Sequence, residues 1–275
     1  MNRARSPLSG KRILVTGASS GLGAEIAIQL GERHGAALVL TGRHRARLMA
    51  VGQRLVDQGS EVELIVADLA APGAGKALFE QATRRHRVDA LIYAAGLHWY
   101  GRGEYIPVRT AGNMLAVNAV APIELIERFL PYFDHHHGLG LMAVTSIGAL
   151  TSTPFQAMYG GTKAMLHRYV SDLQLERRLV GAPSHLGLVS PGGMWTAMMR
   201  QSPVGDLARR NVLMRGSFLP VARVANATIC GLIERRYATI PGVWNRLLAL
   251  FFRFVPRFIT RPVIGRLYGG RRCAS

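Results

Sequence analysis

Tyr159 and Lys163 have the residue types and the spacing of an acid–base pair. They stand four apart in a stretch with helical periodicity, so their side chains share one helix face. A lysine ammonium beside a phenol favours the phenolate, and we expect it to lower the pKa of Tyr159. Such a tyrosine can give a proton to a carbonyl oxygen, or take one from an alcohol, as hydride moves. Ser146 precedes Tyr159 by 13 residues and could hydrogen-bond the same oxygen.

A glycine-rich segment near the N-terminus predicts a site for the phosphates of a dinucleotide. Thr16–Gly23 reads TGASSGLG and lies between a strand-like run and an apolar helix pattern. Glycines let the backbone turn sharply and approach a pyrophosphate, and the helix that follows offers free N–H groups and its positive end. The binding candidates in this segment are Gly17, Ser19, Ser20, Gly21, Leu22 and Gly23.

The end of the second strand-like run indicates which dinucleotide binds. An NAD site places an acid about 20 residues beyond the glycines, on the ribose 2′-hydroxyl. This chain has Thr41-Gly42-Arg43-His44-Arg45 there, with no carboxylate. Arg43 can make a charge-assisted contact with a 2′-phosphate. We therefore predict NADP(H) as the cofactor.

Together, these motifs resemble the short-chain dehydrogenase/reductase family. The resemblance rests on Thr16–Gly23, Ser146 and Tyr159-Gly160-Gly161-Thr162-Lys163, and it extends from Lys11 to about Thr196. It implies that Tyr159 is the general acid/base, that Lys163 lowers its pKa and holds the nicotinamide ribose, and that Ser146 positions the substrate oxygen. It implies further roles: Asn118 in a proton relay, and Asp68, Leu69, Ala95, Gly96, Pro191, Gly192 and Thr196 in cofactor binding. Tyr93-Ala94 departs from the family, which often has two asparagines there.

Strand-like and helix-like runs alternate along the chain and predict the elements that hold these residues. Continuous apolar strands between helices indicate a parallel sheet covered on both faces. We predict a single-domain Rossmann fold, residues 1–240, with a C-terminal helical extension, residues 241–275. The predicted strands are Arg12–Thr16, Ala36–Thr41, Glu61–Val66, Ala90–Tyr93, Leu139–Thr145 and His185–Val189. The predicted helices are Gly21–His34, Arg45–Gln58, Gly73–Arg85, Thr110–Phe133 and Ala157–Val180.

Bulky side chains around the predicted site favour a large apolar carbonyl or alcohol as substrate. The candidates are His98 after the fourth strand, and Met194, Trp195 and Met198 after Pro191-Gly192. Methionine and tryptophan offer an adaptable apolar surface, although the same residues could pack the core instead. No metal is expected, because the adjacent imidazoles of His135–His137 point in different directions and no ligand set completes them.

The C-terminal quarter carries most of a formal net charge of +18. Residues 200–275 hold 14 arginines and two acids, which gives 14 − 2 = +12. No nucleic-acid recognition motif accompanies this charge, so nucleic acid is not expected as a partner. From Pro241 a helical pattern combines bulky apolar residues with arginines, but Arg253, Pro256 and Arg257 interrupt it. An interfacial helix on anionic lipid fits this pattern better than a membrane span. The competing reading, a tail that folds back as a pocket lid or pairs with another subunit, is favoured over lipid contact.

Two cysteines and a polar N-terminus without a secretory pattern predict a cytoplasmic protein. If the tail binds lipid, the protein is expected at the inner face of the membrane. The family resemblance implies a homodimer or homotetramer. The same residues would also serve an alcohol dehydrogenase working in the oxidative direction. Two non-catalytic readings stay open at this point: a sensor that binds NADP(H) without turnover, and a membrane-surface scaffold.

Overall fold

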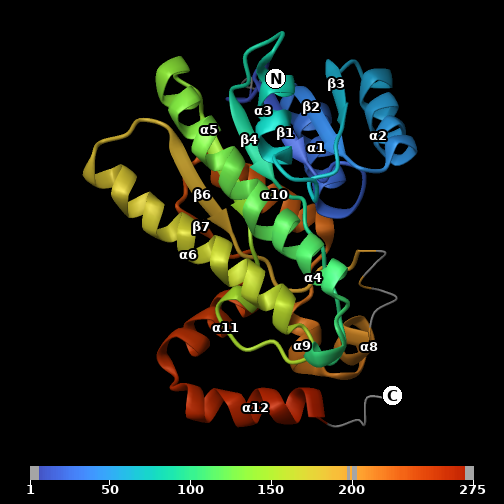
Figure 1. Cartoon of the computed structure of the whole chain (residues 1–275), viewed down its shortest axis with the longest axis vertical. Coiled ribbons are helices and arrows are strands. Elements are labelled where there is room, and N and C mark those ends of the chain that lie inside the picture. Colours follow the sequence, from blue (N-terminus) through green and yellow to red (C-terminus); the bar gives the residue numbers. More distant parts are fainter. Residues whose placement is uncertain (1–5, 197–198, 200–202, 270–275) are drawn as a thin grey trace, which may run out of the picture.

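Seven parallel strands form one sheet in the order β3-β2-β1-β4-β5-β6-β7 (Figure 1). The computed structural model describes residues 6–196, 199 and 203–269. The order reverses direction between β1 and β4, which creates a crevice at the carboxyl ends of the strands. The strands are β1 Arg12–Thr16, β2 Ala37–Gly42, β3 Val62–Val66, β4 Ala90–Tyr93, β5 Gly140–Val144, β6 His185–Val189 and β7 Ala238–Thr239.

Helices cover both faces of the sheet, and each face has its own apolar core (Figure 1). The central strands are buried along their whole length because both of their faces meet helices. This confirms the predicted Rossmann fold. On one side lie α1 Gly21–His34, α2 Arg45–Asp57 and α10 Val221–Ile233. On the other lie α3 Ala74–Thr83, α5 Ala121–His136 and α6 Ala157–Leu179.

The predicted element bounds agree with the observed ones to within one or two residues, with two exceptions. The predicted helix Thr110–Phe133 is divided into α4 Val108–Leu115, a π-helical turn η2 Ala116–Val120, and α5. Strand β7 was not predicted, because two residues are too short to give a pattern. Two short 3₁₀ turns, η1 Gly103–Tyr105 and η3 Ile147–Ala149, follow β4 and β5.

The C-terminal extension consists of two helices instead of the single interrupted helix that the sequence predicts. These are α11 Val243–Phe254 and α12 Arg257–Gly269. The break falls where Pro256 forces the preceding residue out of helical geometry, and Val255 has an extended backbone with φ −85° and ψ 125°. In the chain, the helices α8 Pro203–Arg210 and α9 Val212–Ser217 follow β6 and precede α10. No helix in the described part of the chain is long and apolar enough to cross a membrane.

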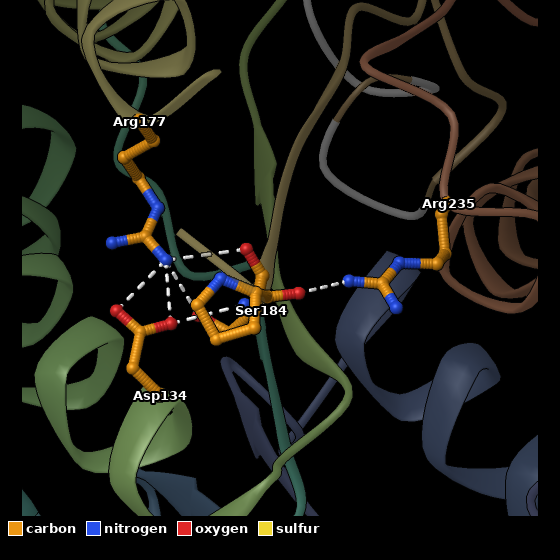
Figure 2. A network of polar contacts seen from close by, with 5 residues as sticks. Asp134, Arg177, Ser184 and Arg235 are labelled. Atoms are coloured by element: carbon orange, nitrogen blue, oxygen red, sulfur yellow. Dashed lines mark hydrogen bonds and ion pairs between the residues drawn. The ribbon is translucent and has the colours of Figure 1, made fainter. Parts of the chain in front are cut away.

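A polar network fixes the ends of α5 and α6 against the start of β6 (Figure 2). The Arg177 guanidinium donates to both carboxylate oxygens of Asp134, at 2.8 and 3.1 Å, and to the Ser184 hydroxyl at 2.7 Å. The Ser184 amide donates to Asp134 at 3.0 Å, and Arg235 donates to the Pro183 carbonyl. Burial alone would raise the pKa of Asp134, but the hydrogen bonds from Arg177 and Ser184 outweigh it and lower that pKa.

Asp134→Asn should destabilise the fold by about 1–3 kcal/mol at neutral pH, because it leaves a largely buried guanidinium without its counter-charge. The pKa of Asp134 is lower in the folded protein than in the unfolded chain, so its carboxylate adds to the free energy of unfolding. This stabilisation is fully present above about pH 4 and is lost as the pH falls through the pKa of Asp134 in the folded protein. Urea unfolding of parent and variant should therefore differ less at acid pH than at pH 7. The control is Asp172→Asn, which removes an exposed ion pair with Arg168 and should change stability by under about 0.5 kcal/mol.

Candidate functional site

A cavity of about 440 Å³ opens at the carboxyl ends of the central strands. It is the crevice expected where the strand order reverses. The structure brings nearly all of the sequence-predicted site residues to its walls. They are Gly17, Ser19, Ser20, Gly21, Leu22, Gly23, Arg43, Asp68, Leu69, Ala95, Gly96, His98, Ser146, Tyr159, Lys163, Pro191, Gly192, Met194 and Thr196.

The glycine-rich turn between β1 and α1 is shaped by close backbone contacts. Gly17 has φ +69°, and a Cβ there would lie 2.9 Å from the Ala95 Cα. A Cβ on Gly23 would lie 2.4 Å from the Gly17 carbonyl oxygen. Gly21 also has a positive φ of +58°, and a Cβ there would make an ordinary contact of 3.6 Å with the Thr196 Cγ2. The start of α1 therefore borders the cavity at the end of a tight glycine turn, where its free N–H groups suit a pyrophosphate.

Basic side chains line the cavity where β2 ends and α2 begins. Arg43 is exposed there, and its Nε lies 3.3 Å from the His44 Nε2. Arg47, which the sequence reasoning missed, lies on the first turn of α2 and lines the same part of the cavity. The spacing of Arg43 and Arg47 could have identified it, because residues four apart near a helix start share one side. The Asp68 carboxylate accepts a hydrogen bond from the Ala70 amide. Asp68 follows β3, so it is not the acid that an NAD site places at the end of β2.

Tyr159, Lys163 and Ser146 meet at the far end of the cavity. Tyr159 and Lys163 lie on consecutive turns of α6, and Ser146 begins the turn η3 after β5, where its Oγ accepts from the Gly148 amide at 3.0 Å. The Ser146 hydroxyl lies beside the Tyr159 phenol on the cavity wall. The Lys163 ammonium is buried and donates to the Val144 carbonyl at 2.9 Å.

The predicted lowering of the Tyr159 pKa by Lys163 is wrong for this arrangement. Burial raises the pKa of the Tyr159 phenol, and the hydrogen bond from Ser146 opposes the rise. Burial also lowers the pKa of Lys163 to about 8. The cause is desolvation, which disfavours both the phenolate and the ammonium, while the ammonium is directed at the β5 carbonyl.

Asn118 lies inside the π-helical turn η2, behind the cavity wall. Its side chain donates to the Leu97 carbonyl at 2.9 Å and to the Thr162 hydroxyl at 3.0 Å, and accepts from the Leu97 amide at 2.8 Å. It is fully buried. Gly96 lies between Asn118 and Lys163. A Cβ on Gly96 would lie 3.5 Å from both the Asn118 Oδ1 and the Lys163 Nζ. Asn118 thus ties the loop after β4 to α6, next to Lys163.

Tyr93 has a structural role in this turn that explains the departure from the family pattern. The Ala121 amide donates to the Ala116 carbonyl, five residues back. In an α-helix it would donate to the Val117 carbonyl, four residues back, so that carbonyl lacks its usual donor. The next residue, Pro122, has no N–H to offer. The buried Tyr93 hydroxyl donates to the Val117 carbonyl at 2.6 Å instead. Sequence reasoning missed this role, although Pro122 in the first turn of α5 was a signal.

Tyr93→Phe should destabilise the protein by about 1–3 kcal/mol, because it removes a donor from a buried carbonyl without changing the shape of the side chain much. Denaturant unfolding followed by circular dichroism measures the loss. Tyr237→Phe is the matched control, since that ring is half exposed and its change should stay within about 0.5 kcal/mol. Equal stability of parent and Tyr93→Phe would contradict the role given to Tyr93.

The predicted substrate-pocket residues divide into two groups. His98 and Met194 line the cavity, and Met199, which was not predicted, joins them. The His98 ring meets the Tyr159 ring edge-on at 4.9 Å, and its Nε2 lies 2.7 Å from the Gln156 Oε1. Burial lowers the pKa of His98. Trp195 does not line the cavity but packs on Phe218 at 4.6 Å, and Met198 lies outside the described residues.

The described residues also include the run of three histidines weighed above for metal binding. His135 and His136 end α5, and His137 follows in left-handed geometry with φ 53°. No group of metal-ligating side chains occurs in residues 6–196 and 203–269.

Comparisons with known proteins agree with this geometry. The sequence profile described as short chain dehydrogenase matches residues 11–205. The chain belongs to the short-chain dehydrogenase family. A relative from Arabidopsis thaliana called 11-beta-hydroxysteroid dehydrogenase 1A is 30% identical over 265 residues, which covers 92% of this chain and 74% of the relative. The family places the chain among the oxidoreductases that transfer a hydride between a nicotinamide cofactor and an alcohol or ketone.

Solved structures of family members have the same architecture. One from work on a 7beta-hydroxysteroid dehydrogenase has a TM-score of 0.80 at 20% identity, covering 94% of this chain and 98% of that chain. A metagenomic short-chain oxidoreductase in complex with NADP has a TM-score of 0.70 at 26% identity, covering 86% of this chain and 98% of the other. The first likeness concerns the fold alone.

Proposed function

We propose that this chain is an NADPH-dependent reductase of bulky apolar ketones or aldehydes. The observation that carries the proposal is the grouping of Ser146, Tyr159 and the buried Lys163 on the wall of one cleft. Arg43 and Arg47 line the same cleft at its other end. The intact acid–base set favours a reductase over a sensor or scaffold that binds cofactor without turnover.

The residues of the cleft fit an NADP molecule along its length. The bare glycine turn would take the pyrophosphate at the start of α1, and Asp68 with Leu69 would lie beside the adenine. Arg43 and Arg47 would hold a 2′-phosphate, which no carboxylate at the end of β2 would repel. The metagenomic relative in complex with NADP supports the same choice.

Arg43→Ala should weaken NADPH binding by about tenfold or more, because it removes charge-assisted contacts to the 2′-phosphate, and should leave NADH binding nearly unchanged. Titration of intrinsic fluorescence with each cofactor gives both dissociation constants. Arg45→Ala, an exposed arginine in the first turn of α2 that lies outside the cavity wall, is the matched control. The proposal for Arg43 is wrong if the ratio of the two constants does not change.

The chain's own groups then supply the proton and the orientation for reduction. When bound, NADPH supplies a hydride for the carbonyl carbon. The Tyr159 hydroxyl donates its proton to the carbonyl oxygen, and the Ser146 hydroxyl holds that oxygen with a hydrogen bond. The Lys163 ammonium, fixed on the Val144 carbonyl one helical turn from Tyr159, would hold the nicotinamide ribose and so orient the hydride donor. Hydride and proton together convert the ketone to a neutral alcohol.

Tyr159→Phe should lower kcat for ketone reduction by at least about 100-fold while NADPH still binds, because only the proton donor is lost. NADPH absorbance with a panel of ketones and aldehydes of increasing size measures the rates. Tyr169→Phe is the control on the same helix, ten residues further on and partly buried in the core. Similar rates for Tyr159→Phe and parent would remove Tyr159 from the proton transfer.

The rate of reduction should also depend on pH in a defined direction. Burial lowers the pKa of Lys163 to about 8, so the side chain is a cation below that value and neutral above it. Loss of the cation weakens the hold of Lys163 on the nicotinamide ribose that orients the hydride donor, and we expect kcat/KM for reduction to fall above about pH 8. A profile from pH 6 to 10 with saturating NADPH tests this. A level profile up to pH 10 would contradict it.

The apolar substrate class follows from the walls of the cavity near Tyr159. Leu97, Met194 and Met199 line it together with the partly buried ring of His98. Methionine side chains adapt to irregular apolar shapes, which suits a bulky carbonyl compound. The name of the Arabidopsis relative, a hydroxysteroid dehydrogenase, supports a rigid apolar substrate of this kind. Faster turnover of large apolar ketones than of short polar ones is the result expected in the panel.

We also propose that the enzyme works in the cytoplasm, at the inner face of the membrane. The low cysteine count is consistent with a reducing compartment, and the charge of residues 200–275 favours anionic surfaces. Assembly into a homodimer or homotetramer stays a prediction from the family resemblance.

A further inference from the structure

The outward faces of α11 and α12 form a large exposed apolar surface. Both helices also have an inward face: Asn245 and Ala249 of α11, and Thr260 and Ile264 of α12, are buried. These pairs are four residues apart, so each helix is held against the domain along one side. The exposed bulky apolar side chains are Val243, Trp244, Leu247, Leu250, Phe251, Phe254, Phe258, Ile259 and Val263. We call these nine residues the apolar terrace.

Arginines flank the apolar terrace, and acids are missing from this part of the sequence. Arg246, Arg253, Arg261 and Arg266 are all exposed. Residues 235–275 contain nine arginines and no Asp or Glu. An apolar helix face bordered by arginines is the composition of helices that lie in the interface of an anionic bilayer.

The terrace lies at the substrate end of the molecule. Figure 1 shows α11 and α12 beyond the end of the domain at which α6 begins. The Tyr268 phenol in the last turn of α12 lies beside the Gln156 side chain. The Gln156 Oε1 in turn lies 2.7 Å from the Nε2 of His98, on the cavity wall. At the start of α11, Asn245 lies against Gly192, another cavity residue. Both helices are therefore connected to the site.

We propose that the apolar terrace docks on an anionic lipid bilayer, so that an apolar carbonyl substrate dissolved in that bilayer reaches the cavity beside α12. The delivery of substrate from the bilayer rests on the proposed reductase function. The docked helices lie in the plane of the headgroups, with the terrace among the acyl chains and the arginines at the phosphates. No bilayer is crossed in this arrangement.

The charge of the terrace distinguishes a bilayer from a second copy of the chain. In a two-fold symmetric dimer the same patch meets itself, so exposed arginines of one copy would face those of the other. Residues 235–275 offer no carboxylate to compensate them. An anionic headgroup layer compensates each arginine directly.

Flotation of the full-length protein with lipid vesicles tests the docking. Binding to phosphatidylcholine vesicles containing 30% phosphatidylglycerol, a level chosen as roughly that of an anionic membrane, should be at least about tenfold tighter than to phosphatidylcholine alone. It should weaken with added salt. Phe254→Glu/Phe258→Glu should reduce the binding by at least about tenfold. Leu179→Glu/Val180→Glu is the matched control at the end of α6: its side chains are 78% and 79% exposed, against 74% and 76% for the phenylalanines.

A second variant keeps the test valid if Phe254→Glu/Phe258→Glu does not fold, which its circular dichroism spectrum would reveal. Arg253→Gln/Arg261→Gln leaves the apolar terrace intact and should reduce the preference for anionic vesicles. Docking is refuted if the parent floats with neither vesicle, or if the folded glutamate variant floats as well as the parent. Docking is also refuted if the parent does not float with vesicles and sediments as a dimer, while Phe254→Glu/Phe258→Glu sediments as a monomer. The terrace would then be a contact between two copies of the chain.

Delivery of substrate is tested separately with two ketones. With a long apolar ketone dissolved in the anionic vesicles, Phe254→Glu/Phe258→Glu should be at least about tenfold slower than the parent. With a short ketone in water the two should be equal, because the catalytic residues are untouched. Equal rates on the vesicle-held ketone would overturn delivery from the bilayer. A parent that floats with vesicles but reduces neither ketone would overturn the proposed reductase function and leave the docking standing.

Discussion

Parallel pairing forces the carboxyl ends of β1, β4 and β5 to one edge of the sheet, and the site depends on this constraint. Each strand must be followed by a crossover that returns the chain to the opposite edge. The loops after β1, β4 and β5 therefore meet, although the strands end at Thr16, Tyr93 and Val144, far apart in the sequence. Gly17 and Ala95 approach so closely that a single Cβ at residue 17 would separate them. The cofactor cleft exists because the first two of these loops can touch.

The π-helical turn before α5 is the second feature on which the site depends. It inserts one extra residue into the helix at the position of Asn118, and such turns are common at functional sites. The inserted residue displaces a backbone hydrogen bond, and Tyr93 supplies the missing donor from the end of β4. Tyr93 and Asn118 thus fasten β4 and its loop to the π turn and α6, on which Lys163 lies.

The sequence predicted features that have a strong local pattern and missed those that depend on tertiary contacts. The strand runs, the glycine turn and the Tyr159–Lys163 spacing are local, and the structure places all of them as predicted. The π turn was missed because the hydrogen bond that compensates it joins Tyr93 to a carbonyl 24 residues away. The pKa of Tyr159 was expected to fall because spacing reveals the neighbouring lysine but not the burial that raises it. Trp195 was misplaced because composition cannot distinguish a cavity wall from a small apolar cluster.

Hydride transfer to an apolar carbonyl is the central claim, and following the transferred hydrogen tests it most directly. NADPH deuterated at the transferring position of its nicotinamide would be incubated with the protein and a bulky cyclic ketone. Mass spectrometry of the alcohol should find one deuterium on the former carbonyl carbon. An alcohol without that deuterium, or no alcohol from any large or small ketone while NADPH stays bound, would contradict the account.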